Sequence, residues 1–171
     1  MEKRSGLVTV QGNPLTLVGP ELRPGDRAPE FTVVDAELKP VHLADFAGKV
    51  KLISVVGSLD TQTCELQTRR FNQEAARLSD RVAVLTVSVD LPFAQGRFCS
   101  THGIEGLRVL SDYQQVSFGT AYGVLVDGLR LLARAIFVVD AEDVIRYVEI
   151  VPEVSEHPDY EKALAVVATL V

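Results

Sequence analysis

The two cysteines, Cys64 and Cys99, are the residues of this chain best suited to do chemistry, and Cys64 has the more informative surroundings. It follows an apolar, β-branched run at residues 50–56, which predicts a buried strand. Residues 65–78 are rich in Glu, Gln, Arg, Ala and Leu, a composition that favours a helix. We therefore expect Cys64 in the first turn of a helix that begins just beyond a strand, with Thr61 among the possible N-caps.

That position favours an ionised sulfur, although not strongly enough by itself. The nucleophilic form of cysteine is the thiolate, and a free thiol is only about 3% ionised at pH 7. The unpaired N–H groups of a first helical turn contribute about 0.3–1 kcal/mol, which is less than one pKa unit. A mostly ionised Cys64 therefore needs a further cation, such as an arginine from elsewhere in the chain. The alternative is a small buried cysteine that only fills the core, and the spacing alone leaves both open.

One arginine, Arg134, lies in an unusual setting. It lies within the apolar segment 131–139, which predicts a strand. A buried charge is costly unless it has a partner, so an arginine at this position is expected to have one. The alternative is an arginine at a strand end whose side chain reaches solvent.

The spacing of the cysteines and histidines argues against a metal site. Cys64 and Cys99 form no Cys-x-x-Cys motif, and two sulfurs cannot make a four-cysteine site. The three histidines are scattered and form no metal-binding pair. We expect neither a metal nor an organic cofactor. A purely structural disulfide is uncommon in a reducing cytoplasm, where paired cysteines are more often transient and catalytic.

Composition narrows the classes of partner. The chain has 171 residues and a net charge of −6, from 17 basic and 23 acidic residues. This balance argues against nucleic acid or an anionic membrane as the main partner. No run of 18 apolar residues is present, and the first residues do not resemble a signal peptide, so the expected location is the cytoplasm.

The order of predicted elements indicates an α/β fold. An N-terminal β-hairpin is expected at about residues 7–18, and residues 1–171 are expected to form one domain. Strands that alternate with helices, followed by a hairpin and a last helix, predict a sandwich with a mixed central sheet flanked by helices. The remaining strands are expected at 31–34, 41–43, 82–89, 107–110, 133–139 and 144–151, and the remaining helices at 92–102, 111–120 and 160–170.

A set of short motifs is spread over nearly the whole chain. They are Val10-Gln11-Gly12-Asn13-Pro14, Ser58-Leu59-Asp60-Thr61 leading to Cys64, Phe71-Asn72-Gln73, Asp90-Leu91-Pro92-Phe93-Ala94-Gln95, Arg97-Phe98-Cys99, Ala121-Tyr122-Gly123-Val124 and Ala133-Arg134-Ala135. Together they resemble the thiol peroxidases, an atypical two-cysteine branch of the peroxiredoxins. The resemblance implies a thioredoxin-like fold.

The resemblance also implies a mechanism. Cys64 matches the peroxidatic cysteine and Cys99 the resolving cysteine, while Thr61 and Arg134 match residues that position the peroxide. Such enzymes reduce hydrogen peroxide and organic hydroperoxides through a cysteine sulfenic acid and an intramolecular disulfide. Thioredoxin is the expected reductant, and a homodimer is the expected assembly.

One residue departs from the family pattern. The pattern Pro-x-x-x-Thr-x-x-Cys would place a proline at position 57, where this chain has Gly57. Two other functions therefore stay open: a peroxide sensor that passes oxidation to a partner, and an inactive binding module on the same fold. A disulfide also needs Cα atoms within about 7 Å, so we expect the turn at Cys64 and residues 92–103 to unfold locally before a Cys64–Cys99 bond forms.

Overall fold

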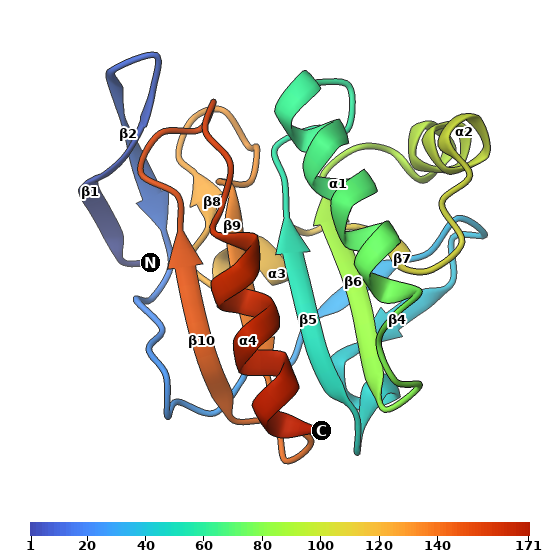
Figure 1. Ribbon diagram of the computed structural model, residues 1–171. Coiled ribbons are helices and arrows are strands. Elements are labelled where there is room, and N and C mark those ends of the chain that lie inside the picture. The colour runs from blue at the N-terminus through green and yellow to red at the C-terminus, as the bar shows by residue number, and fades with distance from the viewer.

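A computed structural model describes all 171 residues, and a mixed sheet forms its centre (Figure 1). Its strands are β1 (Lys3–Val10), β2 (Asn13–Val18), β3 (Thr32–Val34), β4 (Pro40–His42), β5 (Val50–Val55), β6 (Val82–Ser88), β7 (Arg108–Ser111), β8 (Leu125–Val126), β9 (Ala135–Val139) and β10 (Ile145–Ile150). Its helices are the 3₁₀ turn η1 (Leu43–Phe46), α1 (Gln62–Ala75), α2 (Pro92–His102), α3 (Ser117–Ala121) and α4 (Tyr160–Leu170). No helix of the chain combines the length and the hydropathy needed to cross a bilayer.

The central sheet has seven strands in the order β10-β9-β5-β6-β7-β3-β4. Strand β5 lies near its middle and is parallel to β6 but antiparallel to β9. The parallel half arises because α1 connects β5 to β6 and α2 connects β6 to β7, whereas β9 and β10 form an antiparallel hairpin. The predicted mixed α/β sandwich is confirmed.

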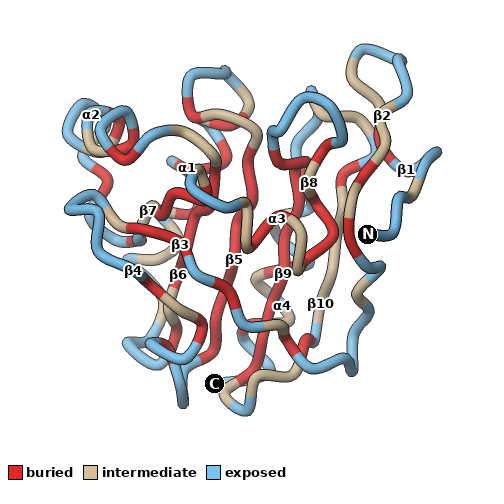
Figure 2. The backbone as a smooth tube through the Cα atoms, turned by 180° about the vertical axis from the view of Figure 1, so that it is seen from behind, coloured by how far each residue is buried: buried red, intermediate tan, exposed pale blue.

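Residues of the central strands alternate between two cores. In β9, Phe137 and Val139 face one core, while Ile136 and Val138 face the other. Helices α1 and α4 cover one face in Figure 1, and α3 lies on the opposite face. The tube in Figure 2 is buried along the middle strands and exposed mainly in turns and in the N-terminal hairpin. Because both faces are covered, β5, β6 and β9 are mostly apolar on both sides rather than alternating between apolar and polar residues.

The N-terminal hairpin forms as predicted but pairs differently from the other strands. Strands β1 and β2 form a three-stranded sheet with the short β8, which the sequence analysis did not identify. Gln11 and Gly12 make the turn, both at positive φ. The tip of the hairpin lies against the loop between β10 and α4, where the Thr9 amide donates to the Pro152 carbonyl at 2.7 Å.

The prediction of a helix at 111–120 is wrong for the first half of that range. Ser111 instead ends β7, where it pairs with Ser88 of β6 and Val34 of β3. Val116 has a left-handed backbone conformation, with φ 45°, and α3 begins only at Ser117. Tertiary pairing at the sheet edge therefore overrides the local helix-start signal of Ser111 and Asp112. The strand predicted at 133–139 also begins later than expected. β9 begins at Ala135, so Arg134 precedes the strand rather than lying within it.

Candidate active site

Cys64 lies where the sequence predicted, in the first turn of α1, and is only 2% exposed. Thr61 is the N-cap by backbone conformation, but its hydroxyl donates to the Ser58 carbonyl at 2.7 Å and caps no helical N–H. The backbone N–H groups of Gln62, Thr63 and Cys64 therefore have no hydrogen-bond acceptor within the chain. Three free donors and the positive end of the helix dipole thus lie in the turn that carries Cys64.

Arg134 meets Cys64 directly. Its Nη1 lies 3.3 Å from the Cys64 Sγ and 2.9 Å from the Gln67 Oε1. Its Nε and Nη2 donate to the Val154 carbonyl at 2.9 and 2.6 Å. The side chain is 2% exposed, and no carboxylate is among its partners. The expected partner of this buried charge is therefore the sulfur together with two neutral oxygens.

Gln67 is a site residue that the sequence analysis missed. It lies one helical turn after Cys64 and is fully buried. Its Nε2 donates to the Ser54 Oγ at 2.7 Å, so its Oε1 is turned towards Arg134. A glutamine in a helix is ordinarily exposed, and the only signal was its i, i+3 relation to Cys64 on the face that packs against β5.

A pocket of about 340 Å³ opens beside Cys64 and Arg134. Thr61 lines it, and so do apolar residues from three separate segments: Val10 of the hairpin, Leu131 and Val154. Gly57 also lines it and contributes no side chain. A Cβ at Gly57 would have one close neighbour, the Leu132 carbonyl oxygen at 3.4 Å, so the backbone would accept a side chain there.

Cys99 lies in α2, as predicted, and lines a different pocket from Cys64. It is half-buried beside a separate pocket of about 180 Å³, together with Asp35 and Arg108. Burial raises the pKa of the Cys99 thiol. Both cysteines are free thiols. The two cysteines thus line different pockets.

A polar cleft separates the two helices that carry the cysteines. It measures about 470 Å³ and is lined by Asp60 and Glu65 on one side and by Arg97 and His102 on the other. The His102 Nε2 lies 3.6 Å from the Glu65 Oε1 across this cleft. No group of three His, Cys, Asp or Glu side chains is arranged as metal ligands would be.

Comparisons with known proteins agree with this geometry. The Redoxin family model matches residues 23–164. A thiol peroxidase of Halalkalibacterium halodurans is 59% identical over 157 residues, covering 92% of this chain and 94% of that protein. A thiol peroxidase of Bacillus subtilis is 51% identical over 164 residues, covering 96% and 98%.

Solved structures extend the agreement to the fold. A peroxiredoxin-like protein from Aquifex aeolicus superimposes with a TM-score of 0.91 at 42% identity, covering 98% of this chain and 99% of that one. A thiol peroxidase from Chromobacterium violaceum gives a TM-score of 0.84 at 25% identity, with 95% of each chain covered. The thioredoxin-like fold is thus confirmed, and the chain belongs to the redoxin family, among its thiol peroxidases.

Proposed function

We propose that this protein is a thiol-dependent peroxidase that reduces hydrogen peroxide and organic hydroperoxides. The observation that carries the proposal is the 3.3 Å contact between the Arg134 Nη1 and the Cys64 Sγ, made by a buried arginine that has no carboxylate partner. An apolar-lined pocket opens at that sulfur. The thiol peroxidases that match this chain over most of its length support the same activity.

In the first step the Cys64 thiolate attacks the terminal oxygen of the hydroperoxide. A sulfur–oxygen bond forms and the O–O bond breaks, so that sulfur is oxidised to a sulfenic acid and the peroxide is reduced to water or an alcohol. The leaving oxygen takes up a proton. Arg134 and the free N–H groups at the start of α1 stabilise the negative charge that moves from the sulfur to the departing oxygen.

Thr61 has a specific part in this step. Because its hydroxyl proton is donated to the Ser58 carbonyl, the lone pairs of Oγ1 are left as acceptors. The proton-bearing oxygen of a hydroperoxide can donate to them. Thr61 would thereby hold the peroxide with its terminal oxygen towards Cys64, in line with the bond that breaks.

In the second step Cys99 condenses with the Cys64 sulfenic acid, which forms a disulfide and releases water. Because Cys99 faces another pocket, α2 must unwind or turn first. Unwinding would also expose Cys99 to water and so remove the burial that raises its pKa. A dithiol protein, for which we propose thioredoxin, then restores both thiols by exchange. We further propose that the enzyme acts in the cytoplasm as a homodimer.

One experiment tests both steps. Fully reduced protein is mixed with one equivalent of hydrogen peroxide, quenched after increasing times and analysed by mass spectrometry. We expect the loss of two hydrogens within seconds and peptides linked from Cys64 to Cys99. The Cys99→Ser variant should instead accumulate a Cys64 sulfenic acid that dimedone traps, and should lose thioredoxin-supported turnover. Thiols that persist for minutes would contradict the proposal and favour a binding role.

A further inference from the structure

The loop between β10 and α4 contains a carboxylate, Glu153, that accepts four hydrogen bonds. Its Oε1 accepts from the Thr9 hydroxyl at 2.8 Å and from the Gly12 amide at 3.0 Å, both in the N-terminal hairpin. Its Oε2 accepts from the Ser155 amide at 3.0 Å and the Ser155 hydroxyl at 2.8 Å. Glu153 therefore bridges the hairpin tip to its own loop, and no cation is among its partners.

The peptide that follows Glu153 leads directly to the reactive centre. The Val154 amide donates to the Thr9 carbonyl at 2.9 Å, back to the hairpin. The Val154 carbonyl accepts both the Nε and the Nη2 of Arg134. These two bonds set the guanidinium plane and hence the direction of Nη1 towards the sulfur.

The next residue contacts the helix that carries the cysteine. The Ser155 carbonyl accepts from the Thr63 hydroxyl at 3.1 Å, in the first turn of α1 beside Cys64. Val154 and Ser155 line the pocket at Cys64, and so does Val10 of the hairpin. The bonds of Glu153 thus join the hairpin tip to the loop, and the Ser155 carbonyl joins the same loop to the start of α1, so that three elements meet around one pocket.

We propose that Glu153 is a positioning residue for the peroxidase reaction. By joining the hairpin to the loop, it fixes the Val154 carbonyl that aims Arg134 at Cys64. This inference rests on the function proposed above and extends it, because it makes the N-terminal hairpin part of the active site rather than an appended element.

The charge of Glu153 suits this role. The hydrogen bonds from Ser155, Gly12 and Thr9 lower its pKa to about 2, so it stays an anion that accepts from all four donors throughout the neutral range. Glu156 offers a matched control. It lies three residues further along the same loop, is exposed, and its carboxylate accepts no hydrogen bond.

The test compares Glu153→Ala, Glu153→Gln and Glu156→Gln in the full-length chain. Two quantities are measured at 25 °C: the second-order rate constant for oxidation of Cys64 by hydrogen peroxide, and the rate of Cys64 alkylation by iodoacetamide as a function of pH in a Cys99→Ser background. For Glu153→Ala we expect oxidation slower by about ten- to a hundredfold, because small misplacements of a catalytic group have effects of that order. The midpoint of its alkylation profile should move to higher pH, since Arg134 would be less well aimed.

The graded variants sharpen the result. Glu153→Gln keeps one carbonyl acceptor but turns an amide group towards donors, so we expect an intermediate loss. Glu156→Gln should match the wild type within about twofold, because an exposed charge with no partner contributes little. If Glu153→Ala does not fold, Glu153→Gln and Thr9→Val answer the question, since Thr9→Val removes one donor and keeps the side-chain shape.

Three outcomes would overturn the inference. Glu153 variants that behave like Glu156→Gln would contradict it while leaving the peroxidase function intact. A lower melting temperature with unchanged oxidation and alkylation profiles would show that Glu153 only stabilises the fold. A wild-type protein that does not react with peroxide would instead refute the underlying function.

Discussion

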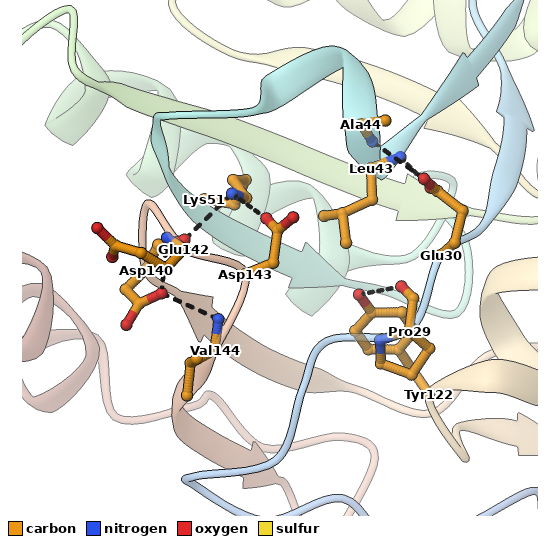
Figure 3. A network of polar contacts seen from close by, with 10 residues as sticks. All are labelled: Pro29, Glu30, Leu43, Ala44, Lys51, Tyr122, Asp140, Glu142, Asp143 and Val144. Carbon is orange, nitrogen blue, oxygen red and sulfur yellow. Dashed lines mark hydrogen bonds and ion pairs between the residues drawn. The ribbon is translucent and has the colours of Figure 1, made fainter.

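Two buried cations lie at opposite ends of the same pair of strands, and their partners differ. Lys51 is the second residue of β5 and lies opposite Val139, whereas Arg134 immediately precedes Ala135, which pairs with Val55 at the other end. Lys51 is 0% exposed and Arg134 is 2% exposed. The Lys51 Nζ contacts the Asp143 carboxylate and donates to the Asp140 carbonyl at 3.1 Å (Figure 3).

The difference separates a structural charge from a reactive one. The charge of Lys51 is matched by a carboxylate, so the ion pair connects β5 to the turn between β9 and β10. The paired charges exert little electrostatic field on other groups. Arg134 is held by the neutral oxygens of Gln67 and Val154, so its charge remains available to the Cys64 sulfur. Equal burial thus leads to different roles because the partners differ in charge.

Arg134→Met should give the largest effect and tests the reactive side of this comparison. Loss of the cation and its donors should slow Cys64 oxidation by about a hundred- to a thousandfold, the usual effect of deleting one electrostatic stabiliser of a transition state. Stopped-flow mixing with hydrogen peroxide measures this rate. Arg134→Lys is the control: it keeps the charge but replaces the planar guanidinium fork with a single ammonium nitrogen, so its rate should fall between those of the wild type and Arg134→Met. An oxidation rate of Arg134→Met within tenfold of the wild type would contradict the role of Arg134 as the reactive charge.

Lys51→Met tests the structural side. Removing one member of a buried ion pair should lower the free energy of unfolding by about 3 kcal/mol, the lower end of the usual range because Asp143 is 25% exposed and can hydrate. The oxidation rate of Cys64 should not change. Urea unfolding measures the stability, and Lys49→Met, which alters an exposed lysine two residues earlier, should change it by less than about 0.5 kcal/mol. A slower oxidation in Lys51→Met would show that the two ends are coupled.

A buried anion, Asp112, extends the comparison to the opposite charge. It accepts from the amides of Phe118 and Gly119 at 3.0 and 2.8 Å, yet burial raises its pKa to about 6. Between pH 4 and pH 6 the folded state therefore binds more protons than the unfolded state, so this group lowers stability as the pH rises and its full effect is present above pH 6. The change should be roughly 2–3 kcal/mol.

Asp112→Asn should remove this contribution. The difference in unfolding free energy between wild type and variant, measured in urea at pH 4, 5, 6 and 7, should move in favour of the variant as the pH rises and then level off. A constant difference across that range would mean that the two amide donors fully compensate the buried charge.

The sequence revealed some parts of the site and concealed others for physical reasons. Cys64 and Arg134 stood out because a sulfur at a strand-to-helix junction and a charge in an apolar segment are each unusual by local criteria. Gln67 did not stand out, because its burial depends on how α1 packs against β5. Glu153 was missed because its four donors come from segments more than 140 residues away as well as from its own loop. The start of α3 was misplaced because the pairing of Ser111 lies outside any local window.

Gly57→Ala gives the smallest expected effect. It tests the end of the strand pair that carries Arg134, where Gly57 lines the pocket beside Cys64. The new methyl group would lie 3.4 Å from the Leu132 carbonyl oxygen, in ordinary contact, so the variant should gain about 0.4–1 kcal/mol through reduced freedom of the unfolded chain. The methyl group also takes up room in the pocket at Cys64. Oxidation by cumene hydroperoxide should therefore slow by about three- to tenfold, while oxidation by hydrogen peroxide should change by less than about twofold. Gly96→Ala, where a Cβ meets nothing within 4 Å, is the control and should leave both rates unchanged. If Gly57→Ala slowed oxidation by both peroxides equally, the space left by Gly57 would control the access of any peroxide to the sulfur. It would then not select substrates by their size.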